Sequence, residues 1–239
     1  MSSRLLIAAP LRVEALIVGS APRGARAARV RKTGMGPKHA MRTAAMLART
    51  PGRALLVLGF CGGLDTESVP GEVIVAEAVL AARDEGHSDA TERIVCADAA
   101  GLTEGLRDRG MTVRSGEIVC VSKIALGERR AQLLADGAIA VDMESVWLTP
   151  GAAGRPFAVV RVVLDSPSHE LLRPQAVAGA LRAARVLRRV AGALRDWAPP
   201  PPPPPPPPRE SQRAGRSGPE TVRDGGSGSA GLHEGSPEG

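Results

Sequence analysis

The segment AVDMES at residues 140–145 places two carboxylates, Asp142 and Glu144, at the end of an apolar run. Two further acids stand in similar places: Glu14 follows the first apolar run of the chain, and Asp165 ends a valine-rich run. Burying an unpaired carboxylate is costly, so such residues are normally exposed, paired or used in chemistry. Carboxyl groups held in one pocket could give or take protons during a reaction.

The elements that must position these acids follow from the apolar runs, which alternate with helix-like segments. Near-continuous Val, Ile and Leu runs suit strands buried on both faces. The alternation therefore predicts an α/β fold with a mixed, mainly parallel central sheet flanked by helices. The expected strands are 4–9, 28–30, 53–60, 72–79, 112–122, 138–143 and 155–165, and the expected helices start near Arg12 and cover 37–50 and 127–136.

Polar motifs stand where these apolar runs end. They are Glu14, GMG at 34–36, GFCGGL at 59–64, AVDMES, and VVLDSP at 162–167. In open α/β sheets, ligands collect at the carboxyl ends of the strands. One such coincidence would mean little, but the convergence of all these motifs in one sheet predicts a pocket.

The glycine motif TGMGPKHA at 33–40 predicts a helix N-terminus. The exposed backbone N–H groups around Gly34 and Gly36 could bind an anion or a ribosyl oxygen, and a tight strand-to-helix turn is the structural alternative. The motif fails as a dinucleotide fingerprint because His39 occupies the third glycine position.

The motif GFCGG at 59–63 fits the nucleophile elbow of α/β-hydrolases, with Cys61 as the nucleophile. Asp165 and His169 follow in the order that a triad requires, but only four positions separate them, which is too little chain for two separate loops. A small cysteine that packs among glycines is the alternative. Asp165 alone would equally suit a turn before Ser-Pro.

The composition indicates one folded domain and a tail. Residues 1–197 are rich in Ala, Leu, Val and Arg, whereas residues 198–239 begin with a proline run and continue with Gly, Ser and charged residues. The second composition buries too little apolar surface to fold, so 198–239 is predicted to be a disordered tail. The scarcity of aromatic residues, two Phe, two Trp and no Tyr, disfavours single-stranded nucleic-acid binding.

The net charge of +6 is concentrated in the amphipathic segment 173–197. This pattern predicts a C-terminal helix that packs on the core with a solvated arginine face. A peripheral contact with a membrane surface or an acidic partner is the alternative. The N-terminal run is interrupted by charges, which argues against a signal peptide or a membrane span.

The cysteines are three in number and form no CxxC pair. The count argues against a disulfide framework and against a zinc site, and no metal site or cofactor is predicted. A reducing cytoplasm is the expected location.

Taken in order, LIAAPLRVEAL, GMG, GGLDTESVPGEVIVAEAV, AVDMES and an Arg-(x)3-Asp strand end resemble the motifs of the nucleoside phosphorylase and nucleosidase superfamily. The resemblance covers approximately residues 4–195. Within this superfamily, the sequence is most similar to the hopanoid-associated phosphorylases, which release adenine from adenosylhopane. The similarity lies in the segments GMGP, AVDMES and RVVLDSPSHELLRP. Methylthioadenosine/adenosylhomocysteine nucleosidases are more distant relatives. The resemblance implies a single-domain, three-layer phosphorylase-like fold and a homo-oligomer, commonly a dimer.

The resemblance also implies roles for particular residues. Glu144 would accept hydrogen bonds from the ribose hydroxyls with Met143 beside the sugar, Asp165 would protonate the purine at N7, and Glu14 would activate water. Protonating the base requires a site dry enough to keep a proton on Asp165. The base would lie against a pocket formed by Phe60, Cys61, Gly62, Ile124 and Ala125.

Two questions stay open at the level of the sequence. The phosphorylase branch holds phosphate with an Arg and a Ser, and Val57 and Phe60 stand in their places here, which favours hydrolysis. Arg12 and Lys38, with the Gly34 and Gly36 amides, could still bind phosphate as a co-substrate. The chain after Glu144 is shortened and broken by Pro150, so a degenerate member that binds nucleosides without turnover is the second hypothesis.

Overall fold

The computed structural model describes residues 4–22, 24, 28–82, 93–169 and 176–199. The predicted disordered tail falls, from residue 200 onward, outside the described residues, as do residues 173–175 at the start of the predicted C-terminal helix.

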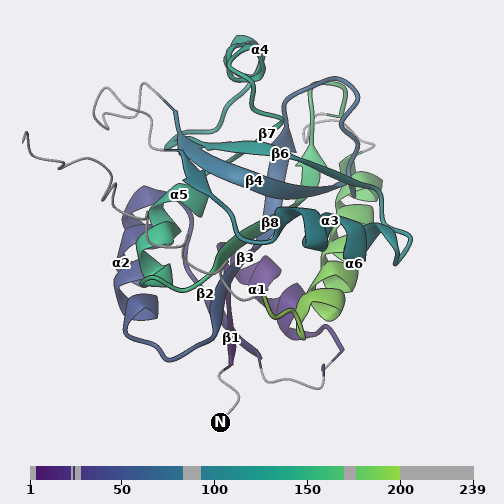
Figure 1. Cartoon of the computed structure of the whole chain (residues 1–239). Coiled ribbons are helices and arrows are strands. Elements are labelled where there is room, and N and C mark those ends of the chain that lie inside the picture. Colours follow the sequence, from purple (N-terminus) through teal and green to yellow (C-terminus); the bar gives the residue numbers. More distant parts are fainter. Residues whose placement is uncertain (1–3, 23, 25–27, 83–92, 170–175, 200–239) are drawn as a thin grey trace, which may run out of the picture. The chain divides into compact units, whose positions relative to one another are not determined.

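An eight-stranded mixed sheet forms the centre of the fold (Figure 1). Its strands are β1 (Leu5–Ala9), β2 (Ala28–Lys32), β3 (Ala54–Gly63), β4 (Val73–Ala81), β5 (Ile94–Val95), β6 (Val113–Cys120), β7 (Ala140–Asp142) and β8 (Phe157–Asp165). The helices are α1 (Arg12–Gly19), α2 (Pro37–Ala48), α3 (Ala99–Arg107), α4 (Glu128–Ala135), α5 (Ser145–Leu148) and α6 (Ala176–Leu194), with a 3-10 turn at Thr149–Ala152.

Strand order and direction bring the predicted motifs together. The order is β2-β1-β3-β7-β6-β4-β5, and β8 pairs with both β3 and β4. The β1–β2, β1–β3, β3–β8, β4–β6 and β6–β7 pairs are parallel, so the carboxyl ends of β1, β3 and β8 share one edge. The β3–β7, β4–β8 and β4–β5 pairs are antiparallel. The predicted mixed, mainly parallel sheet is confirmed.

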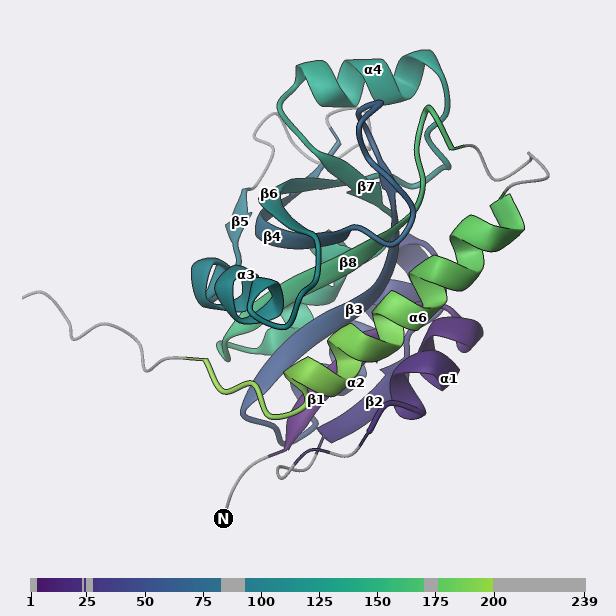
Figure 2. The ribbon, with the colours of Figure 1, turned by 90° about the vertical axis from the view of Figure 1, so that its right-hand side faces the viewer.

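Helices cover both faces of the sheet, because successive side chains of a buried strand point to opposite sides. Leu5 and Ile7 of β1 pack toward α1, α3 and α6, whereas Leu6 and Ala8 pack toward α2 and α5. Figure 2 shows α6 and α1 on one face, with α4 at the end of the sheet. The arrangement of helix, sheet and helix layers confirms the predicted fold class.

The observed elements differ from the predicted ones at the end of β3 and in several short elements. β3 extends to Gly63, so the GFCGG motif lies inside a strand that the apolar pattern ended at residue 60. The short strand β5 and the helices α3 and α5 were not predicted; α3 buries Leu102, Thr103 and Leu106.

The α6 helix packs on the core through Ala183, Leu187, Val190, Ala191 and Leu194. Its arginines at 182, 185, 188 and 189 are exposed. No helix within the described ranges has the length and apolar character needed to span a membrane. A peripheral membrane contact of this basic face stays a prediction.

Candidate active site

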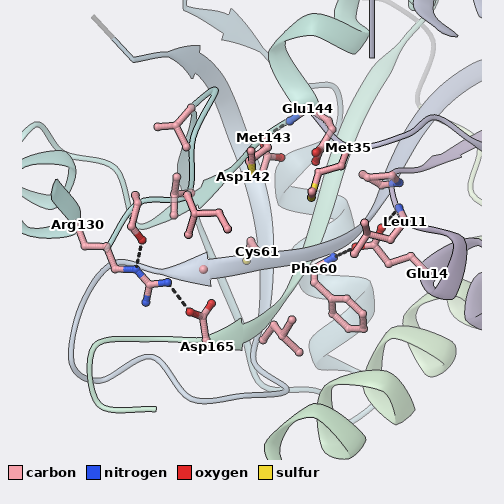
Figure 3. A pocket seen from close by; sticks show the side chains of 17 residues that line it. Leu11, Glu14, Met35, Phe60, Cys61, Arg130, Asp142, Met143, Glu144 and Asp165 are labelled. Carbon is pink, nitrogen blue, oxygen red and sulfur yellow. Dashed lines mark hydrogen bonds and ion pairs between the residues drawn. The ribbon is translucent and has the colours of Figure 1, made fainter. Parts of the chain in front are cut away.

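One cavity opens at the carboxyl ends of β1, β3, β7 and β8 (Figure 3). It brings together Glu14, Glu144 and Asp165, which come from three distant parts of the chain. The cavity is lined by Pro10, Leu11, Glu14, Met35, Phe60, Cys61, Gly62, Val121, Ile124, Ala125, Arg130, Val141, Asp142, Met143, Glu144, Leu164 and Asp165. Figure 3 shows Glu14 and Glu144 at one end and Asp165 with Arg130 at the other.

Glu14 is held in place by backbone amides. The Leu11 N–H donates to Oε2 at 2.5 Å, which closes the first turn of α1, and the Phe60 N–H donates to Oε1 at 2.6 Å. Burial raises the pKa of Glu14, while Arg161 and the two amides oppose the rise. Each carboxylate oxygen has a second acceptor position. Glu14 is therefore a fixed carboxyl group that can still receive a proton from a bound water, and its raised pKa makes it a stronger base than an ordinary carboxylate.

Arg161 is the cation around which the acids are arranged. Its side chain is fully buried, and Nη2 lies 2.6 Å from Oδ2 of Asp142 and 3.7 Å from Oε2 of Glu144. Nη2 also donates to Ser145 Oγ at 2.9 Å. A buried guanidinium with several carboxylates meets the condition that buried charges be paired.

Asp142 has a structural role in this cluster. Its Oδ1 accepts hydrogen bonds from the Cys120 thiol at 2.8 Å and from the Glu144 and Ser145 amides at 3.2 Å. Arg161 and these donors outweigh burial and lower the pKa of Asp142. A carboxylate so fully occupied anchors the backbone that carries Glu144.

Gly59 lets the two charged groups approach the sheet. A Cβ at this position would lie 2.6 Å from both Arg161 Nη1 and Glu14 Oε1. Any side chain at position 59 would therefore displace the guanidinium or the carboxylate.

Glu144 differs from Asp142 in its surroundings. Its Oε1 accepts the Gly36 N–H at 3.0 Å. Burial raises the pKa of Glu144 to about 7; Arg161 opposes the rise and the Asp142 charge adds to it. Glu144 therefore changes protonation within the physiological range, with one oxygen held by Gly36.

The raised pKa of Glu144 predicts a pH-dependent stability. The folded protein retains a proton that the unfolded chain releases near the ordinary value of 4.5, so Glu144 progressively destabilises the fold as the pH rises from about 4.5 to about 7. Glu144→Gln does not titrate and keeps an acceptor for the Gly36 amide. The melting temperature of the variant minus that of the wild type should increase across this range and level off above it, as measured by calorimetry in matched buffers.

Glu14, whose pKa is also raised, is present in both proteins and contributes to the pH dependence of both melting temperatures. A difference in melting temperature that stayed constant across the same pH range would contradict the prediction.

The base-pocket predictions fall on the same cavity. Phe60, Cys61 and Gly62 lie on β3, and Ile124 and Ala125 lie in the loop before α4. The Met143 side chain lines the cavity between Asp142 and Glu144. Ile124 is 70% exposed, and Met35 at the mouth is 53% exposed. The cavity therefore has a mainly apolar wall and an apolar rim.

The structure argues against Cys61 as a nucleophile. The residue sits within β3, whereas a nucleophile elbow requires a sharp turn from strand to helix. Burial raises the pKa of the Cys61 thiol above its ordinary value, so the reactive thiolate is disfavoured. No histidine is among the cavity residues of the described chain.

The anion-binding prediction for Gly34, Gly36 and Arg12 needs correction. The Gly34 amide donates to the Pro10 carbonyl at 2.9 Å, and the Gly36 amide donates to Glu144. Arg12 is exposed on α1 and does not line the cavity. The amides are thus occupied by the protein itself, and Gly36 positions Glu144.

Sequence reasoning missed Arg130 and assigned no task to Arg161. Arg130 is 5% exposed on α4, and its Nη2 lies 2.5 Å from Oδ2 of Asp165. The segment GERRAQLLAD showed two adjacent arginines with no local signal to distinguish a buried from a solvated one. Among the described residues, no group of His, Cys, Asp and Glu has the arrangement of a metal site.

A family model described as the phosphorylase superfamily matches residues 10–192, which include every acid of this cavity. The chain belongs to the phosphorylase superfamily. A comparison with curated proteins gave no match.

Several solved structures share this fold over nearly their whole length. An S-adenosylhomocysteine nucleosidase from Streptococcus pyogenes, in complex with 5-methylthiotubericidin, superimposes with a TM-score of 0.65 at 18% identity, covering 81% of this chain and 98% of that one. Futalosine hydrolase of Helicobacter pylori gives a TM-score of 0.68 at 16% identity over 81% and 97% of the two chains. A 5′-methylthioadenosine/S-adenosylhomocysteine nucleosidase from Neisseria meningitidis, with methylthio-immucillin-A, gives 0.66 at 16% identity over 81% and 99%.

Proposed function

We propose that this phosphorylase-superfamily protein cleaves the N-ribosyl bond of a purine nucleoside. The observation that carries the proposal is the placement of Glu14, Glu144 and Asp165 on one cavity, with the first two at one end and Asp165 at the other. This separation matches a ribose held between two carboxyl groups and a base that reaches the third.

Each acid has one task in the proposed reaction. Glu144 accepts hydrogen bonds from the ribose hydroxyls, and its negative charge stabilises the cationic ribosyl centre that forms as the base departs. Glu14 takes a proton from the attacking water. Asp165 donates a proton to N7 of the purine, because an unprotonated purine anion is a poor leaving group.

Water is the favoured nucleophile. Glu14 is fixed by two amides at the ribose end, where a base for water is needed. Binding phosphate would require free donors, but the Gly34 and Gly36 amides already have partners. Phosphorolysis, with phosphate as co-substrate, is the alternative outcome of the assay below.

The favoured substrate is an adenine nucleoside with a bulky apolar 5′ group, adenosylhopane being the specific candidate. The exposed Met35, which lines the cavity near Glu144, supports an apolar substituent. Methylthioadenosine or adenosylhomocysteine fits the same chemistry, and solved structures with this fold include nucleosidases named for those compounds.

The test is product analysis of the purified chain. Adenosylhopane, methylthioadenosine, adenosylhomocysteine and inosine are incubated separately, with and without phosphate, and products are identified by mass spectrometry. Release of free base with free ribose in phosphate-free buffer supports hydrolysis, and a ribose 1-phosphate product supports phosphorolysis. Absence of base release from every nucleoside would refute the proposal.

A second candidate function is binding without turnover. The segment after Glu144 forms only the four-residue helix α5 and a 3-10 turn that contains Pro150. Tight binding of these nucleosides with no product would favour this candidate. A cytoplasmic homodimer stays a prediction.

A further inference from the structure

Arg130 connects the base end of the cavity to helix α4. Its guanidinium makes two hydrogen bonds: Nη2 donates to Asp165 Oδ2 at 2.5 Å, and Nε donates to the Ala125 carbonyl at 2.9 Å (Figure 3). The side chain is buried, and its Nη2 lies against the backbone of β3, 3.0 Å from where a Cβ of Gly62 would be. A side chain larger than hydrogen at position 62 would push the guanidinium away from Asp165.

The two oxygens of Asp165 are therefore not equivalent. Oδ2 is held by Arg130, whereas Oδ1 makes no hydrogen bond to the residues that the structure describes. Arginine has only donors, so it can bind the carboxyl oxygen that lacks a proton but offers nothing to the proton itself. A proton on Asp165 is accordingly directed to Oδ1, which is the oxygen left for a ligand.

We propose that Arg130 is a positioning residue for departure of the base: it directs Oδ1 of Asp165 at the purine and compensates the charge that forms on Asp165. The inference rests on the proposed function. In the reaction, the bond between C1′ and N9 breaks and its electron pair goes to the purine. The Oδ1 proton moves to N7, and Asp165 becomes a carboxylate beside a guanidinium that is already in place. Water adds to C1′ and loses its proton to Glu14.

Arg130 also connects Asp165 to the loop that forms the cavity wall beside it. The Ala125 carbonyl belongs to the loop that lines the base end, and Ala125 is itself buried. One side chain thus sets the distance between the wall and Asp165. The guanidinium geometry matters for both bonds, because the N–H donors of arginine form a rigid planar fork, whereas those of a lysine ammonium surround one nitrogen at the end of a flexible chain.

The experiment compares two leaving groups. Arg130→Met is assayed with the purine nucleoside found in the product analysis and with 4-nitrophenyl riboside, whose nitrophenolate departs without protonation. We expect kcat on the purine nucleoside to fall by about 10²-fold, the lower part of the range for general acids. On nitrophenyl riboside the loss should be less than about tenfold. Arg129→Met, the adjacent arginine on α4, is the matched control and should retain activity on both.

A double-mutant cycle tests whether Arg130 acts through Asp165. If it does, adding Arg130→Met to Asp165→Asn should change kcat on the purine nucleoside by no more than about twofold, the limit of ordinary additivity error. Arg130→Lys, which keeps the charge, should recover part of the loss and serves where the Met variant fails to fold. Melting temperatures identify such failure.

Equal losses on both leaving groups in folded variants, or full additivity with Asp165→Asn, would overturn the role of Arg130. These outcomes presuppose a wild type that releases purine. A wild type that releases none refutes the proposed function instead, so the two failures are distinguishable.

Discussion

Asp165→Asn should lower kcat/KM for purine release by about 10²–10⁴-fold, the usual contribution of a general acid. Asparagine has nearly the same shape, and its amide oxygen can still accept the hydrogen bond that Arg130 donates to Oδ2. It cannot transfer a proton to N7. The loss is measured by following base release at saturating and limiting nucleoside concentrations.

A matched control for this variant is Asp136→Asn, an exposed acid just after α4 and outside the cavity. It should have wild-type kinetics. Full activity of Asp165→Asn would remove Asp165 from the reaction. An unchanged dissociation constant for a nucleoside, together with lost turnover, would locate its effect in the chemical step.

Arg161→Met should destabilise the fold by about 3–5 kcal/mol, the cost of removing one partner from a buried ion pair. Arg161 is fully buried, and its removal would leave Asp142 without its cation and Glu144 beside an uncompensated charge. The free energy of unfolding is measured by urea denaturation at neutral pH. Removing the cation favours protonation of both acids in the folded state, so the deficit should shrink as the pH falls.

The matched control is Arg93→Met. Arg93 pairs with Glu117 at 2.5 Å, but the two side chains are 48% and 28% exposed, so solvent screens the loss. We expect a cost of about 1 kcal/mol or less for this partly exposed pair. Equal destabilisation by the two substitutions would contradict the structural role assigned to the Arg161 cluster.

Parts of this protein could be predicted from local patterns. The apolar runs at 4–9, 72–79 and 155–165 became β1, β4 and β8 nearly residue for residue, because a strand buried on both faces leaves a continuous apolar signal. The acids at the ends of such runs marked the cavity for a related reason. The carboxyl ends of the parallel neighbours β1, β3 and β8 meet at one edge, so Glu14, which follows β1, and Asp165, which ends β8, converge there.

At the GFCGG motif the local sequence pattern predicted the wrong backbone structure. Its glycines suggested a turn, but the chain stays extended through Gly63 because β8 and β7 both pair with this segment. Pairing with two neighbours outweighs the weak strand preference of glycine, since strand propensity depends on context. Because of that pairing, Cys61 lies within a strand and not at the sharp turn that a nucleophile elbow requires.

The amino-acid sequence by itself determined the fold class, the sheet-edge location of the site and the acids that line it. Only the tertiary structure decided which charges meet. Arg161 joins acids from β7 and α1, Gly36 donates to Glu144 across 108 positions, and Arg130 reaches Asp165 across 35. Periodicity records which face of an element is buried, but an ion pair between distant segments depends on strand order, register and helix placement, which no local window contains.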